Sequence, residues 1–179
     1  MRQRTITVTL FAFMTLLLWV NLQMVSAHRW GNWHQNESSN GVWNYAGRNA
    51  EAEAAINDWR ACSGVDLPKK TSHTDMSVFD GNYGATGWWG LAEIIDTKYD
   101  WWCWWWCAIE HGHARFNSYY GGSGGTGSGS DIRGVFCQEV GHLFGLGHSN
   151  NGCMGKGYYN SSNVVDRAHS CADVRNYTH

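Results

Sequence analysis

Two histidines and a glutamate in the second half of the chain have a spacing that suits a metal site. Glu139 and His142 lie in the run QEVGHLFGLGH, residues 138–148. Side chains four residues apart project from one face of a helix, so Gln138 and His142 would face the same point. Glu139 would lie about 100° away around the helix axis, where it can face a water molecule held there. The pattern therefore predicts metal-binding side chains beside a carboxylate that can accept a proton.

A glycine allows the chain to return to the same point. Gly145 follows the predicted helix, and glycine adopts positive φ without strain, which ends a helix sharply. The chain can then double back and bring His148 toward His142. Catalytic zinc takes three protein ligands and leaves a fourth position open for water. Gln138, His142 and His148 would supply those three ligands, and bound zinc lowers the pKa of such a water toward about 7.

The longer pattern resembles the metzincin metalloproteases, whose motif is H-E-x-x-H-x-x-G-x-x-H followed by a methionine turn. Glu139, His142, Gly145 and His148 stand at the motif positions, and Met154 follows in GCMG, where the Met-turn is expected. The run GHLFGLGHS is most similar to the matrixin branch. The resemblance implies an α+β zincin fold with a small mixed sheet, an upstream helix, an active-site helix, a Met-turn and a C-terminal helix.

The same resemblance implies an activity and a cofactor. It points to a zinc metalloendopeptidase that hydrolyses peptide or protein substrates, with Zn²⁺ as cofactor and Glu139 as general base. His142 and His148 would be metal ligands, and Met154 would form the Met-turn. An extended peptide substrate would add to the edge of the sheet near residues 90–95.

Gln138 departs from the family pattern, which has histidine at this position. A carboxamide oxygen is a neutral, hard ligand that suits calcium or magnesium better than zinc. The chain is therefore either a zinc peptidase with a weak third ligand or a catalytically impaired pseudo-protease that binds other molecules. A replacement ligand could come from His111 or His113, which share one face of a predicted strand, although both also fit as surface histidines.

The six cysteines favour disulfides over free thiols, because the count is even and the chain has the start of an exported protein. In metzincins the active-site helix and the Met-turn lie against each other. Cys137 precedes Gln138 and Cys153 precedes Met154, so the resemblance implies a Cys137–Cys153 disulfide. The pairing of the remaining cysteines stays open: Cys62, Cys103, Cys107 and Cys171.

Residues 1–27 have the composition of a secretory signal peptide. Two arginines precede an apolar run over residues 8–20, and small residues follow it up to Ala27. The run is shorter than the roughly 20 apolar residues that span a membrane. We expect cleavage after Ala27 and a single metallopeptidase domain over residues 28–179, secreted to the extracellular space without a membrane anchor.

Charge and composition narrow the possible partners. The formal net charge is −2, with 13 basic and 15 acidic side chains, which argues against nucleic acid as the main partner. The 12 tryptophans are unusually many, and the run WWCWWWC over residues 101–107 is too aromatic to be buried completely. The tryptophans also leave open a carbohydrate-binding module as a third alternative. We expect a monomer that binds peptide or protein.

Periodicity of apolar residues predicts the elements that position these side chains. Helices are expected over residues 48–61 and 131–144, with Ser130 or Asp131 as the N-cap of the second. A glycine- and serine-rich loop over residues 121–130 precedes it, and a last helix is expected within residues 162–177. Four strands are predicted, over residues 65–67, 75–79, 89–95 and 109–117.

Overall fold

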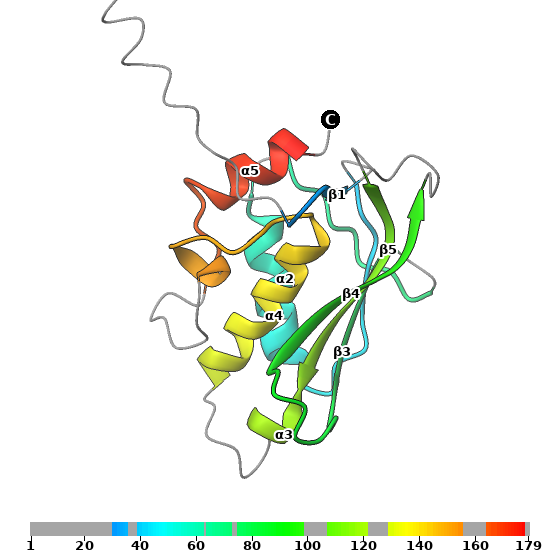
Figure 1. Cartoon of the computed structure of the whole chain (residues 1–179), viewed down its shortest axis with the longest axis vertical. Helices are drawn as coiled ribbons and strands as arrows, with labels where there is room; N and C mark the ends of the chain where they lie inside the picture. Colours follow the sequence, from blue (N-terminus) through cyan, green and yellow to red (C-terminus); the bar gives the residue numbers. More distant parts are fainter. Residues whose placement is uncertain are drawn as a thin grey trace, which may run out of the picture.

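A curled five-stranded sheet with two long helices on one face organises the chain (Figure 1). The computed structural model describes residues 30–35, 39–62, 64–72, 75–98, 107–121, 129–155 and 164–177. The predicted signal peptide, most of the tryptophan-rich run and most of the glycine-rich loop lie outside these ranges.

The sheet is built around its longest strand, β5. The strands are β1 (Trp33–Gln35), β2 (Val42–Asn44), β3 (Met76–Gly81), β4 (Gly90–Lys98) and β5 (Cys107–Asn117). Strand β5 pairs in parallel with β1 and β3 along one side and antiparallel with β4 along the other, and β2 pairs in parallel with β3. Among the described strands, β4 is therefore an edge strand, paired with β5 alone.

Alternation along β5 decides which face of the sheet is covered. Ala114 and Phe116 are fully buried in the core, whereas His113 and Arg115 lie half-buried on the opposite face. This period of two is the pattern expected for a strand with one face on the core. The helices therefore cover only the face that carries the small and apolar side chains (Figure 1).

Helices α2 (Asn49–Arg60) and α4 (Gly129–Leu143) pack side by side on that face (Figure 1). Helix α2 buries one apolar stripe, consisting of Ala52, Ala55, Ile56 and Trp59. The Trp59 indole is fully buried and donates a 2.9 Å hydrogen bond to the carbonyl of Cys137 in α4. The upstream helix thus holds the middle of α4 in place, directly before Gln138.

Two shorter helices complete the described elements, α3 (Ser118–Gly121) and α5 (Ser170–Tyr177). A disulfide joins Cys62, just after α2, to Cys171 in α5. Cys107 is also disulfide-bonded, and the last cysteine, Cys103, lies outside the described residues. No helix in the described ranges has the length and apolar composition needed to cross a bilayer.

Most of the predicted elements are confirmed, with different bounds. The helices at residues 49–60 and 129–143 match the expectation, as do strands β3, β4 and β5 and the helix near the C-terminus. Helix α4 begins at Gly129, before the predicted N-cap. The predicted strand over residues 65–67 is wrong, because this segment forms only isolated bridges, such as the one between Asp66 and Ser39.

Strands β1 and β2 were not predicted from the sequence. Each has three residues, too few for a period of two to be recognised. Their conformation follows from pairing with strands far along the chain: Trp33 lies opposite Cys107, and Val42 lies opposite Met76. Both strands therefore depend on contacts that no local pattern in the sequence reports.

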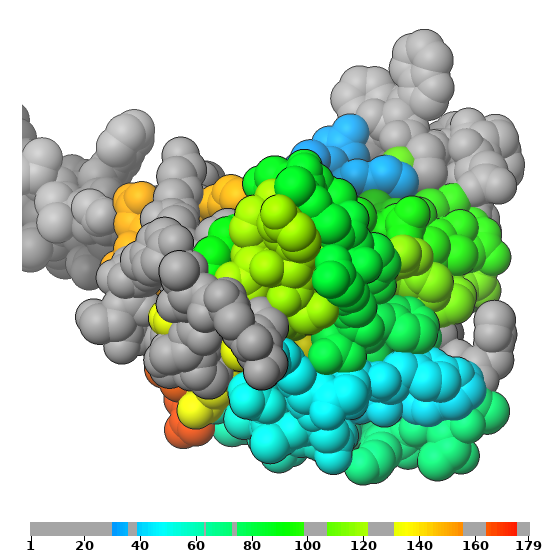
Figure 2. Space-filling model, turned by 90° about the horizontal axis from the view of Figure 1, so that it is seen from below, coloured from blue at the N-terminus to red at the C-terminus, as the bar shows by residue number. Residues whose placement is uncertain are grey.

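The end of the molecule that carries α3 is shown in Figure 2, where α3 lies against the surface of the segment that joins β3 to β4. This β3–β4 loop spans residues 82–89. The Trp89 ring stacks on the Tyr120 ring of α3, with centroids 5.8 Å apart. The loop leads directly into the edge strand β4.

Candidate active site

Helix α4 and the turn that follows it bring the predicted site residues to one cavity. The cavity has a volume of about 280 Å³ and lies between α4 and the start of β4. Its lining consists of Trp30, Gly90, Leu91, Ala92, Gln138, Glu139, His142 and His148. Every side chain predicted to bind metal or transfer a proton therefore faces the same space.

Gly145 is responsible for the return of the chain toward His142. Its φ is 84°, and a side chain at this position would overlap the backbone of Trp33 in β1. The Gly145 amide donates to the carbonyl of His142 at 2.8 Å, and the Gly145 carbonyl accepts from the amide of Trp30 at 2.8 Å. Only glycine satisfies both the positive φ and the close approach, so the turn that carries His148 is docked on the N-terminal strand.

The two imidazole rings face each other across the cavity. Their centroids are 4.9 Å apart, at an interplanar angle of 61°. Nδ1 of His142 donates a 2.7 Å hydrogen bond to the carbonyl of Leu146, which leaves the lone pair on Nε2. Burial and, to a smaller extent, the neighbouring His148 lower the pKa of His142 to about 4, against the opposing effect of the hydrogen bond to Leu146. The ring is therefore neutral at physiological pH, as a metal ligand must be.

Gln138 reaches the same point as the two histidines. Its side-chain nitrogen lies 2.6 Å from Nε2 of His148, to which the amide donates. Gln138 is buried, with 5% of its surface exposed, whereas His148 is exposed. A half-turn of the carboxamide group would replace the nitrogen by the oxygen, the atom that can coordinate a cation.

The donor set fits a divalent metal ion, although it is weaker than three imidazoles. His142 and His148 offer two neutral imidazole nitrogens, and Gln138 offers one amide oxygen. In the described part of the chain, no group of three or more His, Cys, Asp and Glu residues is placed to hold a metal. Gln138 is therefore the third ligand available among the described residues that line the cavity.

Glu139 lies beside this donor set in an apolar environment. Its side chain is 3% exposed, and burial raises the pKa of its carboxyl to about 8, partly opposed by a hydrogen bond from the backbone of Ala92. A side chain at Gly90 would overlap the Glu139 carboxylate and the side chain of Val135. The start of β4 is thus pressed against the one carboxyl group of the cavity.

Trp30 forms a wall of the cavity that we did not predict from the sequence. Its ring packs on the His142 ring, with centroids 5.1 Å apart and an interplanar angle of 44°. The same residue also packs against the hydrophobic core. The only signal in the sequence is the aromatic residue itself, because its place above His142 depends on the docking of β1 near Gly145.

Met154 lies in a buried turn next to the second histidine. It ends a short 3-10 helix, η2 (Gly152–Met154), and its carbonyl accepts a 2.7 Å hydrogen bond from the amide of Ser149. The disulfide Cys137–Cys153 ties this turn to α4, as the metzincin resemblance led us to expect. The short helix η2 is therefore covalently linked to the helix that carries Gln138 and His142.

His111 and His113 lie on the other face of the sheet and do not line the cavity. His111 is 3.5 Å from the hydroxyl of Ser77, and His113 contacts the guanidinium of Arg115 at 3.1 Å. Burial lowers the pKa of His113, as do its neighbours His111 and Arg115. Neither histidine replaces the missing ligand in this arrangement.

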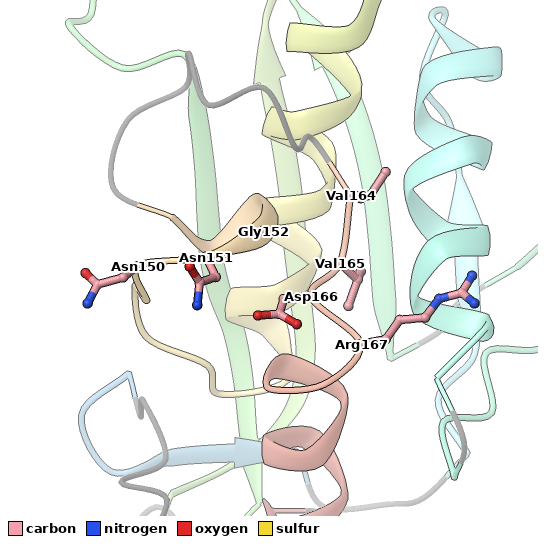
Figure 3. A pocket seen from close by; sticks show the side chains of 7 residues that line it. All are labelled: Asn150, Asn151, Gly152, Val164, Val165, Asp166 and Arg167. Carbon is pink, nitrogen blue, oxygen red and sulfur yellow. The ribbon is translucent and has the colours of Figure 1, made fainter.

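A second hollow, of about 540 Å³, lies beside η2 and is shown in Figure 3. Its lining consists of Asn150, Asn151, Gly152, Val164, Val165, Asp166 and Arg167. It is larger than the histidine cavity but shares no lining residue with it. The smaller cavity holds all of the predicted chemistry, so volume does not identify the candidate site here.

Comparison with known proteins points to the same part of the chain. A family model described as Peptidase M66 matches residues 108–167, which include most of β5 and all of α4 and η2. No curated protein matches the sequence. Among solved structures, the fold is similar to one described as the structure of myroilysin, with a TM-score of 0.45 and 13% sequence identity. The similarity covers 69% of this chain and 55% of that one, so this chain spans about half the length of the matched structure.

The family match covers the segment that supplies Gln138, Glu139, His142 and His148. The match covers 60 of the 179 residues, so it marks a similarity to a peptidase family over this segment.

Proposed function

We propose that this chain is a secreted, zinc-dependent endopeptidase of metzincin type that acts as a monomer on peptide or protein substrates. His142 and His148 would hold zinc, with Gln138 as a weak third ligand and Met154 beneath them. When bound, zinc would polarise water and the scissile carbonyl. The M66 match supports the peptidase class, and the shared cavity supports the choice of residues.

Glu139 is the proposed general base. Its carboxylate would take a proton from the attacking water and deliver it to the nitrogen of the leaving amine as the peptide bond breaks. A carboxyl group with a pKa raised toward neutrality suits both steps, because proton transfer is most efficient when the catalytic pKa lies near the working pH. The carboxyl pKa raised by burial is therefore consistent with this role.

The edge strand β4 is the proposed binding surface for an extended substrate. Gly90, Leu91 and Ala92 line the cavity, and β4 pairs with β5 along one side only. A peptide that pairs with the other side would pass in front of Glu139. Trp30 and the half-exposed Leu91 give this surface an apolar character.

The observation that carries the proposal is the convergence of two imidazoles, a carboxamide and a carboxyl group on one cavity. The same observation favours one alternative, a pseudo-protease that binds peptide without cleaving it. In this structure the Gln138 carboxamide and the His148 ring are already hydrogen-bonded to each other. Zinc must displace this bond, and a site with only two imidazoles gains less from doing so.

Zinc content and peptide cleavage distinguish the two functions. The purified protein would be equilibrated with equimolar zinc, dialysed and analysed for metal, then incubated with casein and a peptide library. We expect one zinc per chain and cleavage that Glu139→Gln reduces by about 100- to 10,000-fold. An inactive, zinc-free wild type whose Gln138→His variant gains both zinc and cleavage would identify a pseudo-protease. An inactive Gln138→His variant that binds zinc would overturn the assignment to peptidases.

A further inference from the structure

Asn117, at the end of β5, is the centre of a hydrogen-bond network outside the cavity. Its side chain is fully buried. Its Nδ2 donates to the carbonyl of Gly84 at 3.0 Å, to Oγ1 of Thr86 at 2.9 Å and to the carbonyl of Trp88 at 3.3 Å. Its Oδ1 accepts from the amide of Tyr83 at 3.1 Å. One side chain therefore holds the β3–β4 loop at four points.

The same residue also binds the first helix beyond the sheet and the last residue of the loop. Oδ1 accepts a second hydrogen bond, from the backbone amide of Tyr119 at 3.1 Å. The backbone amide of Asn117 donates to the carbonyl of Trp89 at 2.8 Å. From α3, the hydroxyl of Tyr120 accepts from the amide of Gly87 at 2.7 Å. Helix α3 and the loop lie against each other at this end of the molecule (Figure 2).

The loop determines where β4 begins. Trp89, which Asn117 holds through its carbonyl, is followed by Gly90, the residue pressed against Glu139. The next two residues, Leu91 and Ala92, line the cavity, and the backbone of Ala92 hydrogen-bonds to the Glu139 carboxylate. A shift of the loop would move these backbone groups relative to the carboxylate, since no side chain at Gly90 separates them.

We propose that Asn117 is a positioning residue for substrate, which fixes the β3–β4 loop and through it the edge of β4 beside Glu139. The proposal rests on the proposed peptidase function for its catalytic consequence. The chemistry favours asparagine, because three acceptors and two backbone donors must be satisfied by one buried side chain. An aspartate has the same shape but would set an oxygen against the carbonyls of Gly84 and Trp88 and so lose the bonds donated to them, whereas the Thr86 hydroxyl could donate to it instead.

The test compares Asn117→Asp and Asn117→Ala with Asn44→Ala. Asn44 is a half-buried asparagine in β2 that also hydrogen-bonds through its side chain, to Asn49 and to the amide of Ala46, but it lies outside the cavity and the loop. We expect the Asn117 variants to lower kcat/KM by roughly ten- to a hundred-fold, mainly through KM, as expected when positioning is lost. Asn44→Ala is expected to keep kcat/KM within about two-fold of the wild type.

A second measurement does not depend on catalysis. Hydrogen exchange of the backbone amides in a peptide that covers residues 90–98 would be compared in the three variants and the wild type, without metal, at a temperature where all remain folded. Faster exchange in both Asn117 variants but not in Asn44→Ala supports the proposal. Unchanged exchange would overturn it. If the wild type cleaves no peptide, the proposed function fails, while this measurement still decides whether Asn117 positions β4.

Discussion

The side-chain nitrogen of Gln138 lies 2.6 Å from Nε2 of His148 in the cavity, so the imidazole nitrogen that could bind a metal accepts a hydrogen bond from the carboxamide instead. Replacing the amide by an imidazole would remove this competition and add a better zinc ligand. We expect Gln138→His to tighten zinc binding by on the order of 100-fold, about 2.7 kcal/mol. Competition titration against a chelator of known affinity measures the change, and Gln138→Ala, which can supply no ligand, should bind more weakly than the wild type.

The stability of the metal-free protein should depend on pH through Glu139 and His142. Burial raises the Glu139 pKa from 4.5 to about 8 and lowers the His142 pKa from 6.5 to about 4. The raised carboxyl pKa stabilises the fold at low pH, a contribution lost as the pH rises from 4.5 to about 8. The lowered imidazole pKa acts in the opposite sense, with stability lost as the pH falls from 6.5 to about 4.

The two effects oppose each other below pH 6.5, and only that of Glu139 remains above it. The free energy of unfolding should therefore fall by up to about 2 kcal/mol between pH 6.5 and 8. Urea denaturation in the presence of a chelator checks this, and Glu139→Gln should flatten the decrease. An equally steep decrease in that variant would assign the titration to another group.

Arg133 and Asp58 join the two long helices through a bidentate ion pair, with nitrogen–oxygen distances of 2.6 to 2.9 Å. The Asp58 side chain is 17% exposed and that of Arg133 34%, so we expect Asp58→Ala to lower the free energy of unfolding by about 1.5 to 3 kcal/mol. The pair between Lys69 and Glu53 is a matched control, because Lys69 is 64% exposed and its distance is 3.5 Å. Lys69→Ala should lower the free energy of unfolding by less than about 0.5 kcal/mol. An equal decrease in both variants would contradict the role of burial.

The two described disulfides should differ in what they stabilise. Cys62–Cys171 closes a sequence separation of 109 residues and Cys137–Cys153 one of 16. The loop-closure entropy of the unfolded chain predicts that the free energy of unfolding falls by about 4.7 kcal/mol when the first disulfide is replaced by two alanines and by about 3 kcal/mol when the second is. Only the second links α4 to η2, next to the proposed zinc ligands, so only its removal should also weaken zinc binding. A larger loss of zinc affinity in the Cys62/Cys171 variant would refute this division.

Gly90 should tolerate no side chain. A methyl group there would overlap Glu139 and Val135, so Gly90→Ala is expected to lower stability by about 1 to 3 kcal/mol and to reduce peptide cleavage. At Gly47 the nearest atom to such a methyl group is Oδ1 of Asp80, at 3.4 Å, an ordinary contact. The midpoint of thermal unfolding of Gly47→Ala should be close to that of the wild type. A similar loss of stability in Gly47→Ala and Gly90→Ala would contradict the steric argument.

The parts of this fold that the sequence predicted are those with a local period. Helix α2 repeats its buried residues at helical spacing, and β5 alternates small or apolar with polar side chains. The grouping of Gln138, His142 and His148 was predicted for the same reason, because helical spacing and one glycine fix their relative positions. These relations involve residues close together in the chain.

The parts that could not be predicted depend on distant contacts. Trp30 becomes a wall of the cavity only because its segment docks at Gly145, and β2 is a strand only because β3 lies beside it. The Asp66 segment has β-branched and apolar neighbours but meets a single partner residue, so it forms a bridge and no strand. The contact between Gly90 and Glu139 likewise follows from the packing of β4 on α4.

The docking of Gly145 on β1 has a consequence for the order of folding. The turn that presents His148 is completed by backbone contacts with Trp30 and Trp33, which lie far from it along the sequence, near the start of the described residues. Contacts between such distant parts of a chain form late, because their closure entropy must first be overcome. A chain still emerging from the ribosome therefore lacks an assembled cavity, and the proposed peptidase activity would require that the whole domain has folded first.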